Sequence, residues 1–305
     1  MNDLVVQTDG LTKRYGERLA VDSVSMTVRR GEVYGFLGPN GAGKTTTLRM
    51  MLGLIRPSAG TVSVLGRPAG RPDVIARVGA LVEGPGFFPY LSGRDNLRTM
   101  ARYRDLGDHA VDAALERVDL TDRAGDRFKA YSLGMKQRLG VASALLGDPE
   151  LIVLDEPTNG LDPAGMADMR ALVVSLARGG QTVLLSSHLL TEVQEICDRV
   201  GVINGGRLLR EARVDELRGE ATLRVRATPE DAAIAVAMRV AGENAVSRTP
   251  LGLELELTAE AAPALVRDLV AAGVDVHEVS PTERSLEEVF FEMTTEAPTT
   301  KEKVA

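Results

Sequence analysis

The 305-residue chain contains one cysteine and no tryptophan, and its first residues, MNDLVVQTDG, lack the basic and apolar regions of a secretory signal. The single cysteine, Cys197, excludes an internal disulfide framework and fits a reducing compartment. No uninterrupted apolar run reaches the ~18 residues of a membrane-spanning helix. We therefore expect a cytoplasmic protein, and any role at a membrane is expected to be peripheral.

The charge balance is acidic, with 43 Asp and Glu against 36 Lys and Arg and a formal net charge of -7. Proteins that bind a phosphate backbone broadly carry an excess of basic residues, so no nucleic-acid partner is expected. Hydrophobic residues make up 44% and charged residues 26%, which excludes a disordered or collagen-like protein. The length is sufficient for about two globular domains.

Short apolar runs alternate with helical patterns through the first two thirds of the chain, which is typical of crossover units on a largely parallel sheet. We expect an α/β fold of that kind. Alternation of Val24, Met26 and Val28 predicts a half-buried strand. Further buried strands are predicted at residues 33–37, 151–154, 182–185 and 200–203.

A largely helical segment interrupts this pattern at about 92–146 and predicts a helical subdomain. Asn-Gly-Gly at 204–206 predicts a hairpin turn, and residues 214–218 predict a short closing helix. The helices expected inside the subdomain are 93–104, 109–118 and 134–146.

Beyond residue 219 the pattern changes to a βαββαβ order, which predicts a small ferredoxin-like α+β domain. Its expected elements are strand 221–227, helix 229–240, strands 245–248 and 251–257, helix 259–272 and strand 274–279. A last helix is predicted at 285–293. The expected domains are therefore 1–219 and 220–293, followed by a flexible tail at 294–305.

Residues 38–45 read Gly-Pro-Asn-Gly-Ala-Gly-Lys-Thr between a predicted strand and a predicted helix through Leu54, which is the P-loop pattern in its required context. Backbone N–H groups of such a loop surround the β-phosphate, Lys44 reaches the β and γ oxygens, and Thr45 offers a hydroxyl to Mg²⁺. The alternative, a glycine-rich turn without a ligand, is disfavoured by that context. The predicted nucleotide-binding residues here are Gly38, Pro39, Asn40, Gly41, Ala42, Gly43, Lys44, Thr45 and Thr46.

A second motif places two carboxylates, Asp155 and Glu156, at the end of the apolar strand 151–154. Asp155 is expected in the shell of the metal ion, and Glu156 is expected to orient and deprotonate the attacking water as general base. Taken alone, an apolar run followed by Asp-Glu is usually a strand that enters a solvated turn. The P-loop upstream favours the catalytic interpretation.

The segment Tyr-Ser-Leu-Gly-Met-Lys-Gln-Arg at 131–138 opens a predicted helix, and here the sequence resembles the ATP-binding subunits of ABC transporters. In that family a Leu-Ser-Gly-Gly-Gln signature binds the γ-phosphate of ATP held by the opposite protomer. Ser132 and Gly134 match its serine and second glycine, whereas Tyr131, Leu133 and Met135 depart from it. Without the other motifs, the segment would be a serine N-cap on an amphipathic helix.

Further landmarks of the family follow in order, and the resemblance covers roughly residues 4–219. It implies that Tyr15 stacks on adenine, that Asp162 lies in a dimer-contact loop, and that His188 is a switch histidine at the γ-phosphate. The alternative roles are structural: a half-buried tyrosine, a helix N-cap and a histidine at a helix start.

Glu83 stands where most of the family has a glutamine that touches the metal and the transport subunit. A charged carboxylate is a harder ligand, so Glu83 is expected in the Mg²⁺ shell and among the catalytic residues. The alternative is a side chain that caps an exposed loop. Phe87, Phe88 and Tyr90 beside it either dock a permease helix or pack under the helical subdomain.

Glu83 and the altered signature resemble the branch of the family that exports bacitracin, lantibiotics and related compounds. The run at 285–290 resembles the C-terminal extension of drug exporters. The resemblance implies an ATPase with ATP and Mg²⁺ as cofactors, a homodimer with composite ATP sites, and an integral membrane permease as partner on the inner face of the membrane. The alternatives are a soluble ATPase acting on nucleic acid or ribosomes, an importer ATPase, and a regulatory module that uses hydrolysis as a timer.

Overall fold

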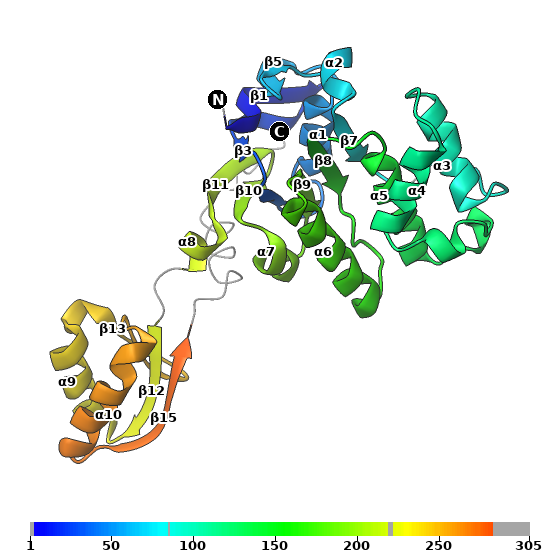
Figure 1. The fold of residues 1–305 in the computed structure, drawn as a ribbon. Coiled ribbons are helices and arrows are strands. Elements are labelled where there is room, and N and C mark those ends of the chain that lie inside the picture. Colours follow the sequence, from blue (N-terminus) through cyan, green and yellow to red (C-terminus); the bar gives the residue numbers. More distant parts are fainter. Residues whose placement is uncertain (1–2, 85, 219–221, 283–305) are drawn as a thin grey trace. The chain divides into compact units, whose positions relative to one another are not determined.

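The computed structural model describes residues 3–84, 86–218 and 222–282, and the chain divides between Val214 and Asp215 into two compact units. Each unit has its own cluster of buried apolar side chains. We call the described parts the N-terminal unit (3–214) and the C-terminal unit (215–282) and treat each by itself (Figure 1). The helix predicted at 285–293 and the tail at 294–305 lie outside the described residues.

A six-stranded sheet with the order β11-β10-β4-β9-β8-β7 forms the centre of the N-terminal unit (Figure 1). Its strands from β10 to β7 pair in parallel, and β11 closes a hairpin with β10. The predicted buried strands are all present, with their predicted bounds or up to two residues more, and their middle residues are apolar because both faces of the sheet are covered. The strands are β4 (Val33–Leu37), β7 (Val78–Leu81), β8 (Leu151–Asp155), β9 (Thr182–Ser187), β10 (Arg199–Asn204) and β11 (Arg207–Arg213).

A second, antiparallel sheet is built on the long strand β1 (Leu4–Tyr15). The single strand predicted from Val24, Met26 and Val28 is wrong: all three side chains are buried, but the chain forms two strands there. The left-handed backbone of Ser23, with φ 53°, precedes the break between them. The other strands are β2 (Arg18–Val24), β3 (Thr27–Arg29), β5 (Ala59–Val64) and β6 (Arg67–Pro68).

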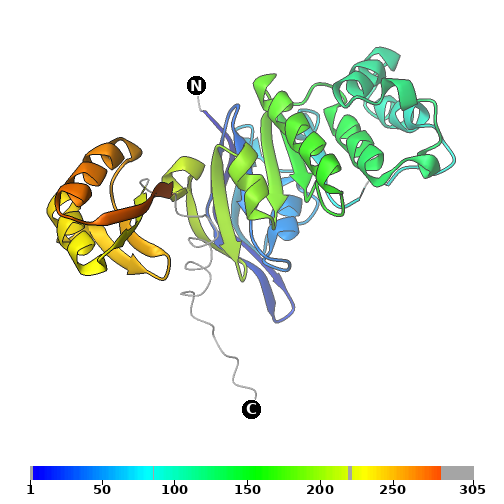
Figure 2. The same ribbon diagram turned by 90° about the horizontal axis from the view of Figure 1, so that it is seen from below.

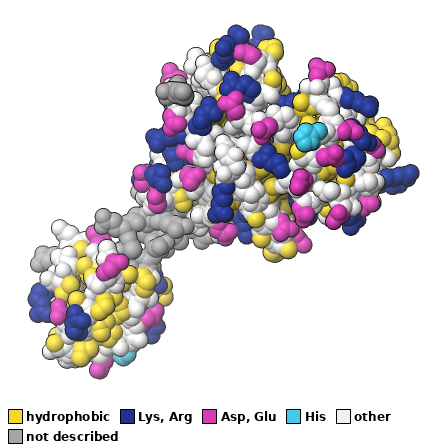
Figure 3. Space-filling model, viewed as in Figure 1, with side chains coloured by type: hydrophobic (Ala, Val, Ile, Leu, Met, Phe, Trp, Pro, Cys, Tyr) yellow, Lys and Arg dark blue, Asp and Glu magenta, His cyan; other side chains and the backbone are white. Residues whose placement is uncertain are grey.

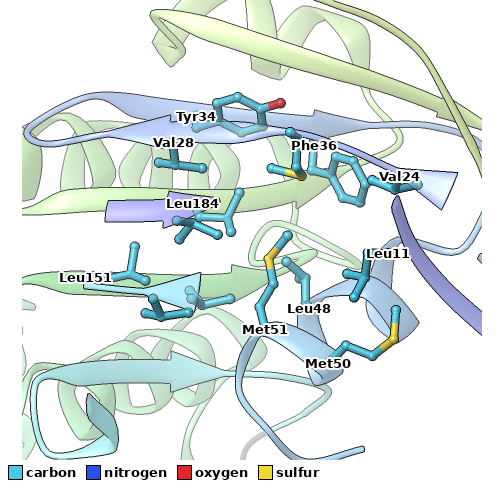
Figure 4. Close-up of a cluster of buried hydrophobic side chains, with 14 of the residues drawn as sticks. Leu11, Val24, Val28, Tyr34, Phe36, Leu48, Met50, Met51, Leu151 and Leu184 are labelled. Carbon is cyan, nitrogen blue, oxygen red and sulfur yellow. The ribbon is translucent and has the colours of Figure 1, made fainter. Parts of the chain in front are cut away.

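Helix α1 (Lys44–Met51) lies between the two sheets, and its side chains Leu48, Met50 and Met51 join the main buried cluster (Figure 4). The predicted continuation to Leu54 is wrong. Gly53 adopts φ 72° and packs on Gly70 so closely that a Cβ would meet the Gly70 backbone, and this close approach ends the helix. The helices α6 (Pro163–Arg178) and α7 (Leu190–Ile196) contact β4 and β9, and α2 (Pro72–Ile75) precedes β7.

The helical subdomain is present, and its three long helices pack on one another around Leu97, Leu115 and Leu139. Figure 2 shows these helices grouped together beside the sheet. Ser92 and Ser132 begin two of the helices by accepting a hydrogen bond from a backbone N–H of the first turn, as good N-caps do. The elements are α3 (Gly93–Arg102), α4 (Asp108–Arg117), the 3-10 turns Thr121–Arg123 and Phe128–Ala130, and α5 (Leu133–Leu145).

The C-terminal unit begins within the short helix α8 (Val214–Arg218) and contains one four-stranded sheet with the order β13-β14-β12-β15, antiparallel at each pairing. Leu223 and Val225 of β12 join a buried cluster with residues of both long helices, whereas Arg224 and Arg226 alternate with them. The elements are β12 (Thr222–Thr228), α9 (Glu230–Ala241), β13 (Val246–Thr249), β14 (Gly252–Leu255), α10 (Ala262–Ala271), which a 3-10 turn Ala259–Ala261 precedes, and β15 (Asp275–Thr282).

Charged side chains of both signs are interspersed on the molecular face in Figure 3. Many pair with one another, as Arg98 does with Asp108 at 2.8 Å. Exposed pairs contribute only ~0–1 kcal/mol each, so the buried apolar clusters carry most of the stability. In the described ranges, no helix has the length and apolar character needed to span a bilayer.

The packing of α1 predicts different losses of stability for two leucine substitutions, one at Leu48 inside the helix and one at Leu54 just beyond its end. Leu48→Ala should destabilise the N-terminal unit by about 2–5 kcal/mol because Leu48 is fully buried and its loss leaves a cavity. Leu54→Ala should cost about 0.5 kcal/mol or less, since Leu54 is 65% exposed. Urea unfolding followed by circular dichroism measures both, and equal costs would contradict the placement of α1.

Candidate functional site

Three neighbouring strands of the parallel sheet, β4, β9 and β8, end at the same edge. The glycine-rich loop 38–43 follows β4, His188 follows β9, and Glu156 follows β8. Gly38 donates its N–H to Ser187 O at 3.2 Å, so the loop starts in contact with the end of β9. The sheet therefore gathers residues that are distant in sequence at one place, as open α/β sheets do at their carboxyl edge.

A pocket of about 400 Å³ lies at this edge. Seven of the predicted nucleotide-site residues line it, together with Glu156. Three lining residues were not predicted: Arg18 and Ala20 from β2, and Asn159 from the loop after β8. The full lining is Tyr15, Arg18, Ala20, Asn40, Gly41, Gly43, Lys44, Thr45, Thr46, Glu156 and Asn159.

The loop needs glycine at Gly43, which precedes α1 with φ 107° and lies so close to β2 that a Cβ would come within 2.6 Å of the Ala20 carbonyl oxygen. No side chain caps the N-terminus of α1. Its first-turn N–H groups, which have no partner inside the helix, are therefore available to an anion.

Lys44 is 5% exposed and is the buried cation of the loop. Its Nζ donates to Gly38 O at 2.6 Å and forms an ion pair with Glu156 Oε1 at 2.9 Å. A buried ammonium needs a negative partner, and here a side-chain carboxylate supplies it. A nearly buried cation beside uncapped helix N–H groups fits the negative charge and the oxygen atoms of a nucleotide phosphate chain.

Glu156 lies between two partners. Its Oε1 meets Lys44, and its Oε2 lies 2.5 Å from His188 Nδ1. Its backbone has φ 50°, and its N–H donates to the Ser186 hydroxyl at 3.0 Å, which fixes the turn that directs the side chain. The structure thus brings Lys44, Glu156 and His188 together, as a site for proton transfer beside a phosphate requires.

Asp155 is the last residue of β8 and is 8% exposed. Its Oδ1 accepts the Ser186 hydroxyl at 2.5 Å. Asp155 and the Thr45 hydroxyl are oxygen ligands of the kind that Mg²⁺ prefers. Among the described residues no group of three or more His, Cys, Asp or Glu side chains could hold a metal ion.

Glu83 does not line the pocket. Its side chain is 64% exposed and forms an ion pair with Arg49 of α1, and its backbone is left-handed with φ 64°. The predicted metal and catalytic role of Glu83 stays a prediction. Beside it, Phe87 packs edge-on against Phe128 of the helical subdomain at 5.3 Å between ring centroids, whereas Tyr90 is 66% exposed.

The signature segment also lies outside the pocket lining of its own chain. Ser132 caps α5 by accepting the Met135 N–H at 3.2 Å, and Asp162 caps α6 by accepting the Gly165 N–H at 2.9 Å. The side chain of Leu161 lies beside Gly134, so the start of α5 contacts the loop 159–162.

The two tyrosines of the predicted motifs, Tyr131 and Tyr15, differ in their exposure to solvent. Tyr131, which departs from the family signature, is 4% exposed and donates its hydroxyl to Arg123 O at 2.8 Å, and burial raises the pKa of its phenol. This residue fills space inside the helical subdomain. Tyr15 lines the pocket with its ring 48% exposed and with Lys13 Nζ 5.0 Å from the ring centroid. An exposed ring of this kind is available for stacking.

The sequence resembles known proteins over nearly its whole length. A family model described as ABC transporter matches residues 21–159. An uncharacterised ABC transporter ATP-binding protein, YhcH of Bacillus subtilis (strain 168), is 41% identical over 98% of both chains. The daunorubicin resistance ATP-binding protein DrrA3 of Streptomyces coeruleorubidus is 39% identical over 96% of this chain and 97% of its own.

Two further comparisons cover about seven tenths of this chain. The bacitracin transport ATP-binding protein BcrA of Bacillus licheniformis is 46% identical over 70% of this chain and 71% of its own. The solved structure of cbiO1 from Clostridium perfringens, part of an ABC transporter complex, matches with a TM-score of 0.65 and 27% identity. That match covers 72% of this chain and 92% of cbiO1.

The environment of Lys44 predicts the effect of removing it. Lys44→Ala should weaken binding of ATP by about 10- to 100-fold, because a charged donor worth ~1.5–3 kcal/mol is lost. Titration with a fluorescent ATP analogue measures the affinity. Lys129→Ala, at an exposed position of the helical subdomain, is the matched control and should bind as the wild type does. Equal affinity for both variants would contradict the phosphate-binding role of Lys44.

Proposed function

This chain belongs to the ABC transporter ATP-binding proteins, and from that membership we propose that it drives a separate membrane permease in the export of an antibiotic, an antimicrobial peptide or a drug-like compound. It binds ATP with Mg²⁺ and hydrolyses ATP, as members of the family do. The observation that carries the proposal is the contact of Glu156, which lines the pocket, with both Lys44 and His188. The export assignment is supported by the bacitracin and daunorubicin relatives, the second of which aligns with nearly the whole chain.

The residues predicted from the motifs have the following proposed tasks at the pocket. Lys44 and the N–H groups of the loop and of α1 bind the phosphate chain, and Thr45 and Asp155 hold Mg²⁺, which neutralises charge on the phosphate oxygens when bound. Glu156 accepts a proton from the attacking water, and His188 orients the Glu156 carboxylate through Nδ1. Tyr15 stacks on the base.

The ion pair between Lys44 and Glu156 explains how binding prepares the site. A phosphate anion and the Glu156 carboxylate compete for the same buried ammonium, whose other close partner is the Gly38 carbonyl oxygen. Nucleotide binding therefore releases the carboxylate from Lys44. The released carboxylate is the free base that hydrolysis needs, while Oε2 keeps its contact with His188.

We propose a homodimer because the site of one chain is incomplete. Ser132 and Gly134 open the helix α5 with N–H groups suited to a phosphate, but neither lines the pocket of its own chain. A second protomer packed around a two-fold axis supplies them, so that Ser132 of each protomer faces Lys44 of the other.

We assign the permease contact to the exposed surface beside Glu83, where Phe88 is 47% and Tyr90 66% exposed. Glu83, at the start of this surface and paired with Arg49 of α1, links it to the helix that begins at the phosphate loop.

The C-terminal unit has the element order and the β13-β14-β12-β15 strand order of a ferredoxin-like domain, and we assign it that fold. Substrate selection belongs to the permease.

Export is tested in cells. Deleting the gene should lower, several-fold, the concentration of bacitracin, a lantibiotic or an anthracycline that the cells tolerate. Wild-type chain should restore tolerance and Glu156→Gln should not, since hydrolysis is required. Unchanged tolerance across the whole panel in the deletion strain would contradict an export role.

The dimer predicts an ATP-dependent change in mass. Glu156→Gln should slow hydrolysis by at least ~10²-fold and should form a stable dimer with ATP and Mg²⁺, because bound nucleotide completes the interface. Light scattering with and without ATP measures the mass. A variant that hydrolyses ATP near the normal rate would refute the general base, and a persistent monomer would refute the composite site.

Mixing two variants sharpens that test. Lys44→Ala and Ser132→Arg chains should each fail to form a complete site, whereas their mixture has one site with an intact P-loop and an intact signature. ATP-dependent dimers should therefore appear in the mixture. Ser247→Arg, at an exposed serine of the C-terminal unit, should behave as the wild type does.

A further inference from the structure

Glu192 is a buried carboxyl group with no task in the mechanism above. It lies on α7, two positions beyond its first residue, and is 1% exposed. Its Oε1 atom has no hydrogen-bond partner among the described residues. Burial raises the pKa of this carboxyl, more than the hydroxyl groups of Ser187 and Thr158 lower it. Burying such a group is costly, so packing alone does not account for it.

The first contact of Glu192 is with the turn that carries His188. The Ser187 hydroxyl donates to Glu192 Oε2 at 2.5 Å and accepts the Leu189 N–H at 3.0 Å. Ser187 itself is 1% exposed. A hydroxyl held from both sides fixes the backbone before and after His188, whose Nδ1 meets Glu156.

The second contact of Glu192 is with the loop that carries Glu156. Thr158, two residues beyond Glu156 and 4% exposed, places its hydroxyl close enough to Glu192 to lower the pKa of that carboxyl. One carboxyl group therefore joins the end of β9 to the loop after β8. These two segments bring His188 and Glu156 to their meeting point.

We propose that Glu192 is a positioning residue for ATP hydrolysis: by holding Ser187 and Thr158 it keeps the His188 imidazole in contact with the Glu156 carboxylate. It acts through these residues and does not touch the nucleotide. The inference rests on the proposed roles of Glu156 and His188. An apolar side chain of similar size would fill the same space without a desolvation cost, which points to the directional hydrogen bonds as the reason for a carboxyl group here.

The test compares two substitutions in the full chain. Glu192→Leu fills the space but offers no acceptor, so kcat should fall about 10- to 100-fold, as expected for a misplaced catalytic pair, with KM changed about 2-fold or less. Glu192→Gln keeps an acceptor oxygen for Ser187 and should retain most of kcat. Glu195→Leu, on the same helix but exposed and paired with Arg170 at 3.1 Å, is the control and should leave both constants unchanged.

A double variant distinguishes positioning from general destabilisation. If Glu192 acts through His188, Glu192→Leu should lower kcat by about 2-fold or less in a His188→Ala background, because residues that act as a unit are not additive. An equal loss in both backgrounds would overturn the proposal. So would a wild-type kcat for Glu192→Leu.

Two further variants, Ser187→Ala and Glu156→Gln, keep the test decisive if Glu192→Leu does not fold or if the proposed catalytic pair is wrong. If Glu192→Leu does not fold, as judged by melting temperature and ATP binding, Ser187→Ala removes the same hydrogen bond with a smaller change, and an unaltered kcat for it overturns the proposal. Glu156→Gln is measured in parallel. Loss of hydrolysis there, with full activity in Glu192→Leu, overturns the positioning role alone, whereas full activity in Glu156→Gln overturns the proposed catalytic pair and the role of Glu192 with it.

Discussion

The parallel register of β4, β9 and β8 is the constraint on which the site depends. Leu37 pairs with Ser187, and Ser186 pairs with Asp155, so the three strands end within one residue of each other. The residues that follow the three strands, the glycine-rich loop, His188 and Glu156, therefore meet at one edge of the sheet. No short segment of the sequence encodes this meeting by itself. The strands can hold this register because they are buried on both faces, where a slip would expose apolar side chains or bury polar ones.

At the same edge, serine hydroxyls stabilise two buried carboxyl groups, Asp155 and Glu192. Successive side chains of a strand point to opposite faces, so the hydroxyls of Ser186 and Ser187 at the end of β9 serve different carboxyl groups. Ser186 donates to Asp155, and Ser187 donates to Glu192. Two adjacent serines thus each donate a hydrogen bond to a buried acid, one at the proposed metal site and one on α7. Without such donors each buried carboxyl would cost several kcal/mol.

Local patterns predicted the elements and residues that depend on neighbours in the chain. The P-loop, the strand before Asp155 and the serine cap at Ser132 all carry their information within a few residues, and the structure agrees with each placement. Features that depend on distant partners were not predictable in this way. The end of α1 depends on Gly70, and Arg18 enters the pocket because β2 pairs with the long strand β1. The partner of Glu83, Arg49, likewise lies on another element.

The loop 157–162 connects the two halves of the proposed mechanism. It begins after Glu156, contacts Glu192 through Thr158, and ends against the start of α5, where Leu133 packs over Gly160 so closely that a Cβ there would lie 3.2 Å from it. The start of α5 is the part of the chain that we assign to the partner's nucleotide. A displacement of α5 on the partner's phosphate must therefore be accommodated by the loop that leaves the general base. A short loop with packed contacts at both ends cannot deform freely. We therefore expect it to transmit a displacement of α5 to Glu156.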